Sequence, residues 1–255
     1  MNLGGLIFTL GIATLAYMTI WFVIARLSNR ADIVDTAWGL GFVYVIWLAW
    51  RLWGSEGGVP LLIVLFVTAW GLRLAWHIFR RTIKKSEDHR YAAYRKKWQD
   101  LFWLHTYTRI FLVQALLLLV ICSSAIAGII SDQPAFTPLL VLGFLVWAVG
   151  IICEAVADYQ LGQFVKTKKK GEIMQAGLWR YSRHPNYFGE VASWWGAALV
   201  GLSLGQWWAV IGAAVITLLI TKISGIPLLE KHYANNKAFQ KYKKHTSVLI
   251  PLPRR

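Results

Sequence analysis

A dense group of polar, aromatic and cationic residues occupies positions 177–190, in the sequence GLWRYSRHPNYFGE, directly before an apolar stretch. The groups that bind anions or exchange protons are Arg180, Arg183, His184 and Glu190, and those that add hydrogen bonds are Tyr181, Asn186 and Tyr187. Arginine binds phosphate through two parallel hydrogen bonds, and a side-chain amide both donates and accepts. So much polar chemistry at the mouth of a hydrophobic segment indicates a specific binding site.

The helix expected to follow this segment supports an anionic ligand. Pro185 suits the first turn of a helix, and the free amides of a helix start favour a negative charge. Glu190 lies one turn beyond Asn186 on the same face. Lys166 and the lysines at 168–170 add charge just upstream. The competing interpretation is a patch of topology-setting charges that contacts lipid headgroups.

Two pairs of polar residues fall inside or beside apolar stretches nearer the amino terminus. Asp32 and Asp35 are one helical turn apart; Asp32 is expected to cap a helix, and Asp35 either caps it or serves the function. Arg73 and His77 share a helix face and either pair with these acids or polarise a substrate oxygen. Charge within hydrocarbon is costly, so each residue needs a partner or a role.

A third pair lies close to the polar segment. Glu154 and Asp158 share a helix face, where they could accept hydrogen bonds from a ribose or an amide, or neutralise nearby lysines. Glu230 either forms a surface pair or belongs to the site. No histidine or cysteine spacing typical of a metal site occurs, so no metal is expected.

The apolar stretches define the fold class. The chain has 255 residues, of which 57% are hydrophobic, and a helix needs roughly 20 apolar residues to cross a bilayer. We expect an all-α, single-domain membrane bundle over 1–255, with seven spans at 5–26, 33–53, 60–79, 110–130, 137–160, 187–204 and 207–229. Its ligand region is expected at 154–190 together with the tail at 230–253.

The distribution of basic residues predicts an orientation. The net charge is +15, and all but three of the 27 Lys and Arg fall on one side if the amino terminus is outside. The positive-inside rule therefore predicts an N-out, C-in topology, with the polar segment facing the cytoplasm. Basic residues beside membrane helices contact anionic lipids, so the expected partner is the bilayer and not a nucleic acid.

The segment GLWRYSRHPNYFGE, the stretches 32–39 and 70–74, and a tail with Tyr242 and Leu249-Ile-Pro251 resemble the DUF1295 family. This family is related to the carboxyl-terminal domain of steroid 5-alpha-reductases, and to sterol reductases and isoprenylcysteine carboxyl methyltransferases. The resemblance covers most of the chain. It implies a bacterial cytoplasmic-membrane protein of lipid metabolism, and no obligate protein partner is inferred.

In the reductases of this group, the resemblance implies NADPH bound at the cytoplasmic side by the fifth-to-sixth helix region and the tail. Carried over, Asp158, Lys166, Asn186, Glu190 and Tyr233 would hold NADPH. Together with the residues named above, the full candidate set for cofactor binding is Glu154, Asp158, Lys166, Arg180, Tyr181, Arg183, His184, Asn186, Tyr187, Glu190 and Tyr233.

The substrate end departs from the reductase pattern. Steroid reductases use a Gln-Glu pair on the second helix and a Tyr on the third, where this chain has Asp35 and His77. These two are the expected catalytic residues, and the expected substrate is a lipophilic enone or enoyl compound other than a steroid. The alternatives are a methyltransferase that uses S-adenosylmethionine and a lipid-binding protein without enzymatic activity.

Overall fold

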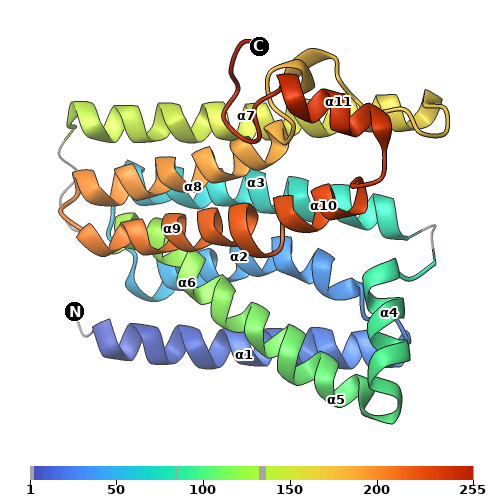
Figure 1. The fold of residues 1–255 in the computed structure, drawn as a ribbon. Coiled ribbons are helices and arrows are strands. Elements are labelled where there is room, and N and C mark those ends of the chain that lie inside the picture. The colour runs from blue at the N-terminus through green and yellow to red at the C-terminus, as the bar shows by residue number, and fades with distance from the viewer. Residues whose placement is uncertain (1–2, 84–85, 132–135, 255) are drawn as a thin grey trace. The chain divides into compact units, whose positions relative to one another are not determined.

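The computed structural model describes residues 3–83, 86–131 and 136–254 and is built from helices (Figure 1). Within these ranges the only β-pairing is an isolated bridge between Ser182 and Ser247. The all-α fold class is therefore confirmed. The chain divides into two compact units, Met1–Pro134 and Ala135–Arg255.

The first unit contains four long helices, α1, α2, α3 and α6, and several short helical segments between α3 and α6. The elements are α1 (Leu3–Leu27), α2 (Ile33–Trp53), α3 (Gly58–Thr82), α4 (His89–Trp98), η1 (Gln99–Leu101), α5 (Phe102–Thr106), the π-helical η2 (Tyr107–Phe111) and α6 (Leu112–Ile129). Helices α2 and α3 approach closely at Gly39 and Gly71, where an added Cβ would lie 2.8 Å or less from a backbone oxygen of the other helix. Small residues allow such close backbone contact between membrane helices.

Helix α4 lies across the direction of the long helices of this unit, as Figure 1 shows. The chain turns at Gln99, whose φ of 43° is unusual for a residue with a side chain. Helix α4 forms within the aromatic and basic stretch 86–104. The span expected at 110–130 begins earlier, because α5 and η2 extend α6 toward the amino terminus.

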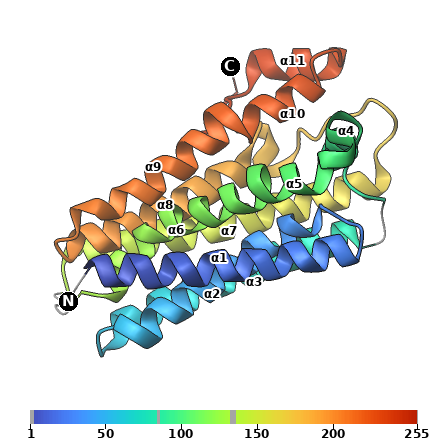
Figure 2. The same cartoon turned by 90° about the horizontal axis from the view of Figure 1, so that it is seen from below.

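The second unit carries the polar segment. Its elements are α7 (Pro138–Thr167), η3 (Gly177–Arg180), α8 (Pro185–Ser203), η4 (Trp207–Ala209), α9 (Val210–Leu218), the π-helical η5 (Leu219–Ile223), α10 (Ile226–His232) and α11 (Lys237–His245). In Figure 2, α9 and α10 follow one another along one line and α11 folds back above α10. Pro185 occupies the first turn of α8 as expected.

Six helical segments in the described ranges are long and apolar enough to cross a membrane. They are Leu3–Leu27, Ile33–Trp53, Gly58–Thr82, His89–Ile129, Pro138–Thr167 and Trp207–His232. The protein is thus a multi-pass membrane protein. Helix α8 forms where the sixth span was expected but is not among the six, since Asn186, Glu190 and its glycines lower its hydropathy. The seven-span count and the N-out orientation stay predictions.

A row of glycines joins α7 to α8. Along α7, Gly143 and Gly150 are seven residues apart, and Gly189 and Gly196 have the same spacing on α8. An added Cβ at Gly150 would lie 2.5 Å from the Ser193 backbone nitrogen, and one at Gly196 would lie 2.5 Å from that of Trp147. The two backbones therefore touch along this row, which fixes the register of the helices that carry the polar segment and Asp158.

Candidate functional site

The polar segment begins with a tight turn anchored on α7. Gly177 has φ +60°, a left-handed conformation that favours glycine. The next amide, that of Leu178, donates to Gln160 Oε1 at 2.9 Å, and the Trp179 indole N–H donates to the Ala157 carbonyl at 3.1 Å. These bonds fix η3 against the end of α7.

The C-terminal segment 246–254 pairs with the polar segment. The Arg183 amide donates to the Ser247 carbonyl at 2.8 Å, and the Leu252 amide donates to the Tyr181 carbonyl at 3.0 Å. The fully buried Ser182 donates its hydroxyl to the Leu249 carbonyl at 2.7 Å. The tail is therefore docked on the polar segment within this unit.

Glu230 on α10 contacts three basic side chains, those of Arg183, His184 and Lys243. Its Oε1 accepts from Arg183 Nε at 2.8 Å, and its Oε2 accepts from Lys243 Nζ at 2.6 Å. His184 Nε2 lies 3.4 Å from Oε1. The partners of Glu230 thus include two residues of the polar segment, and its membership of a functional site stays a prediction.

A second polar contact joins α7 to the start of α8. The Asn186 side-chain amide donates to Asp158 Oδ1 at 3.2 Å, and both residues are half-buried. The sequence placed these two residues in one candidate set from positions 28 residues apart. Their cofactor role stays a prediction, but the contact gives a carboxylate and an amide side by side, which suits the hydroxyl groups of a ribose.

The other candidates differ in exposure. The exposed residues are Lys166, Arg180 and Tyr181, the half-buried ones are Tyr187, Glu190 and Tyr233, and the buried ones are Glu154, Arg183 and His184. Cations open to solvent remain available to phosphates, whereas the Arg183 guanidinium is occupied by Glu230 and by carbonyls of the chain. The exposed and half-buried groups are therefore the better placed to meet a ligand directly.

His184 is held neutral at physiological pH. Its ring stacks on Tyr187 with centroids 5.6 Å apart. Burial lowers the pKa of His184 from 6.5 to about 4, against the opposing effect of its contact with Glu230. The imidazole is thus not a proton carrier near pH 7, and its role in this structure is a packing and hydrogen-bonding one.

This low pKa predicts that acid destabilises the protein. The unfolded imidazole takes up its proton near pH 6.5 and the folded one near pH 4, so between these values the unfolded chain binds more protons. The stability present above pH 6.5 should fall by about 3 kcal/mol as the pH drops to 4. Unfolding in detergent across this range measures it, and His184→Gln should flatten the slope. An equal slope in both proteins would contradict the assignment.

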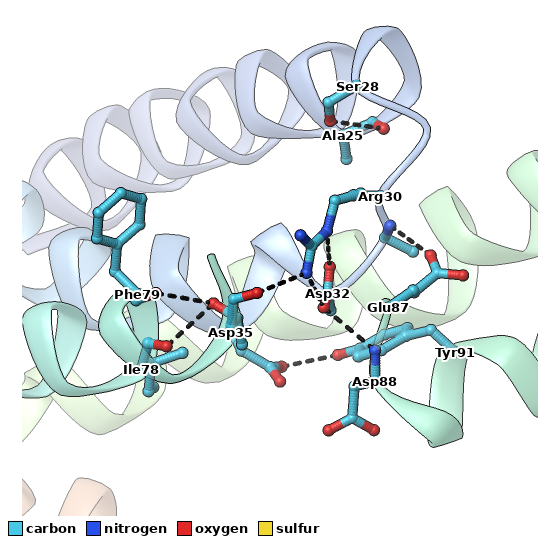
Figure 3. Close-up of polar contacts among 12 residues, drawn as sticks. Ala25, Ser28, Arg30, Asp32, Asp35, Ile78, Phe79, Glu87, Asp88 and Tyr91 are labelled. Atoms are coloured by element: carbon cyan, nitrogen blue, oxygen red, sulfur yellow. Dashed lines mark hydrogen bonds and ion pairs between the residues drawn. The ribbon is translucent and has the colours of Figure 1, made fainter. Parts of the chain in front are cut away.

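A separate polar cluster lies at one end of the first unit (Figure 3). Asp32 is 2% exposed and accepts from Arg30 Nη2 at 2.8 Å and from the Asp88 amide at 3.2 Å. Asp32 lies at the N-cap position of α2, as expected, but its side chain makes no capping hydrogen bond. Because the Asp88 amide donates to this carboxylate, Asp32 joins the α1–α2 turn to the start of α4. The buried negative charge of Asp32 is compensated by Arg30.

Asp35 has its own partners in this cluster. Its Oδ1 accepts from the Tyr91 hydroxyl at 2.7 Å, and its Oδ2 accepts from Arg90 Nη2 at 2.6 Å. Figure 3 shows the Tyr91 hydroxyl pointing at this carboxylate. His77 lies half-buried on α3. The Asp35 carboxylate thus bonds to two residues of α4, and the expected catalytic role of Asp35 and His77 stays a prediction.

Several site residues were not found from the sequence. Ser182, Gln160 and Lys243 all hold the polar segment in place. Gln160 and Lys243 each resemble an ordinary surface residue in their sequence context. Ser182 lies inside the polar segment, so its position was a usable signal. Among the described residues, no group of three or more His, Cys, Asp or Glu side chains is arranged to hold a metal ion.

The family described as a protein of unknown function, DUF1295, matches residues 21–246. Because this match covers most of the chain, the protein belongs to the DUF1295 family.

Curated relatives of the chain include 3-oxo-5-alpha-steroid 4-dehydrogenase 1 of three mammals. The enzyme of Macaca fascicularis is 31% identical over 125 residues, which are 49% of this chain and 45% of that protein. The enzyme of Homo sapiens is 30% identical over 125 residues, 49% and 46% of the two chains, and that of Rattus norvegicus 30% over 115 residues, 45% and 42%. The chain thus matches less than half the length of these relatives. No solved structure matches it.

Proposed function

We propose that this protein is a membrane-embedded reductase that uses NADPH to saturate a carbon–carbon double bond in a lipophilic enone or enoyl substrate. The observation that carries the proposal is the similarity to proteins named 3-oxo-5-alpha-steroid 4-dehydrogenase. A dehydrogenase exchanges hydrogen with its substrate, and reduction of an activated double bond is the reverse direction of that chemistry. The bacterial cytoplasmic membrane is its proposed location, with the cofactor end facing the cytoplasm.

The polar residues of the second unit suit such a cofactor. The Asp158–Asn186 pair offers an acceptor and an amide to ribose hydroxyls, and half-buried Glu190 lies one turn beyond Asn186. Exposed Lys166 and Arg180 supply positive charge for the phosphates. Tyr181, Tyr187 and Tyr233 add aromatic surface on which a planar ring can pack. Together with buried Glu154 these residues form our proposed cofactor set.

Arg183 and His184 play an indirect part in this proposal. Both side chains are buried, and the Arg183 guanidinium already holds Glu230 and the carbonyl of Thr246. They would order the start of α8, and with it Asn186, before any nucleotide arrives. Preorganised donors bind a ligand with a smaller loss of conformational entropy.

NADPH, when bound, supplies a hydride for the carbon β to the substrate carbonyl. The protein's task is to polarise that carbonyl as negative charge develops on its oxygen, which needs a hydrogen-bond donor in a dry environment. Asp35 and His77 remain our candidates, and Tyr91 joins them because its hydroxyl is held by Asp35 at 2.7 Å. Tyr91 is buried at 4% exposure, which keeps bulk water from its hydroxyl.

The proposal is tested by turnover. Purified protein in detergent should oxidise NADPH when given a lipophilic α,β-unsaturated carbonyl compound, and mass spectrometry should find the product two mass units heavier. A panel of sterol-like and isoprenoid enones identifies the substrate class. Transfer of a methyl group from S-adenosylmethionine would instead establish the methyltransferase alternative, and no turnover with either donor would reject both.

A further inference from the structure

We infer that Glu230 is a positioning residue. Its carboxylate holds Arg183, and through Arg183 the C-terminal segment 246–254, against the start of α8. This arrangement fixes the place of Asn186 and so sets nucleotide affinity. The inference rests on the proposed function, because it names what holds the proposed cofactor residues in place.

The carboxylate is enclosed by basic groups. The Arg183 side chain is 9% exposed and that of Glu230 is 13% exposed. Two nitrogens of Arg183 reach Glu230 Oε1, Nε at 2.8 Å and Nη2 at 2.7 Å. An ion pair so nearly buried is strongly harmed by removal of one partner, because the other charge is then left without compensation.

Arg183 also reaches two carbonyls from its remaining nitrogen. Nη1 donates to the Thr246 carbonyl at 2.8 Å and to the Lys243 carbonyl at 3.1 Å. These carbonyls lie at the end of α11, where the helix itself supplies no donor. One guanidinium therefore joins the end of the loop before α8 to α10 and to the end of α11. A lysine could not do this, since it lacks the planar fork of donors.

The same place anchors the tail. The Ser182 hydroxyl accepts from the His184 amide at 3.1 Å and donates to the Leu249 carbonyl, and the Arg183 amide donates to Ser247. The Tyr242 hydroxyl on α11 donates to the Trp179 carbonyl and lies 3.0 Å from that of Ser182. Residues 181–183 are thus hydrogen-bonded to the tail or to α11, and His184 is hydrogen-bonded to Ser182.

The connection to nucleotide binding is short. Asn186 follows Arg183 by three residues and lies in the first turn of α8, so its amide moves with whatever fixes Arg183 and His184. Loss of the Glu230 charge frees Arg183, loosens segment 246–254 and releases this first turn. The Asn186–Asp158 contact, which is 3.2 Å long, is then no longer held in one geometry.

The experiment compares Glu230→Gln, Arg183→Lys and the wild type as full chains in detergent, with Lys244→Gln as the control. Lys244 is an exposed lysine on α11 outside this cluster, so the control removes one charge nearby. Two quantities are measured: hydrogen exchange of the peptide amides in 246–254 without nucleotide, and the Kd for NADPH. Circular dichroism confirms that helix content is unchanged.

Both variants should speed exchange in 246–254 and weaken NADPH binding about tenfold or more. Glu230→Gln removes one partner of the nearly buried ion pair, and Arg183→Lys keeps the charge but loses the planar fork of donors. The control should match the wild type in both. Unchanged exchange in both variants would show that Glu230 and Arg183 do not hold segment 246–254. Faster exchange with an unchanged Kd would show that they hold it without affecting nucleotide binding. Should Glu230→Gln fail to fold, Arg183→Lys, which keeps the charge, decides alone.

The two proposals fail in different ways. A wild type that binds no NADPH would reject the proposed function and the role of the Glu230–Arg183 pair in nucleotide binding. The exchange measurement would still decide whether Glu230 holds the tail, because it is made without nucleotide. If the variants only lowered the overall stability of the protein, exchange would speed up throughout the chain. The inference predicts instead a change centred on 246–254 and the start of α8.

Discussion

Alanine in place of Gly150 is expected to destabilise the protein by about 1–3 kcal/mol or more, the usual cost of overpacking a close contact. The new Cβ would lie 2.5 Å from the Ser193 backbone nitrogen and 2.7 Å from the Gly189 carbonyl oxygen. Neither backbone atom can swing away as a side chain does. Helices α7 and α8 would have to separate, and the contacts along the whole glycine row would weaken.

Gly162 provides the matched control on the same helix. An added Cβ there meets nothing within 4 Å, so Gly162→Ala should be neutral or should stabilise the protein by up to about 1 kcal/mol through helix propensity. The free energy of unfolding in mixed detergent micelles measures both variants. Equal effects at the two positions would show that α7 and α8 do not pack as described.

Removal of the Asn186 amide is expected to weaken NADPH binding by about tenfold or more, the cost of an unmet hydrogen bond in a partly buried site. Asn186→Ala deletes the donor to Asp158, and Asp158→Asn removes the charge from the other side of the contact. Both variants should keep their helix content, because each side chain is only half-buried. Fluorescence titration with NADPH measures the Kd.

The control for this prediction is Asn235→Ala, which removes an amide from an exposed position in the loop before α11. Its Kd should equal that of the wild type. If Asn186→Ala bound NADPH as tightly as this control, the Asp158–Asn186 pair would have no part in the cofactor site.

Hydropathy and local signals predicted much of the fold. The first three spans lie within three residues of the helices found, because long apolar runs and the turns between them are local features. Pro185 marked the start of α8 for the same reason, since proline fits the first turn of a helix.

The pairing of charges could not be predicted in the same way. Glu230 is 47 residues from Arg183, and Asp35 is 56 residues from Tyr91, so both contacts depend on the path of the chain between them. Asp32 looked like a helix cap because acids favour helix starts, but the stronger requirement was a partner for a buried carboxylate. The seven-residue spacing of the glycines is visible in the sequence. Only the close contact of the α7 and α8 backbones shows that these glycines allow the two helices to pack together.

Binding of NADPH to the purified wild type tests the central claim most directly. Titration in detergent, with NADPH and S-adenosylhomocysteine in parallel, should show binding of NADPH at micromolar concentration and none of the methyl-donor product. Binding of S-adenosylhomocysteine in place of NADPH, or of neither compound, would contradict the account.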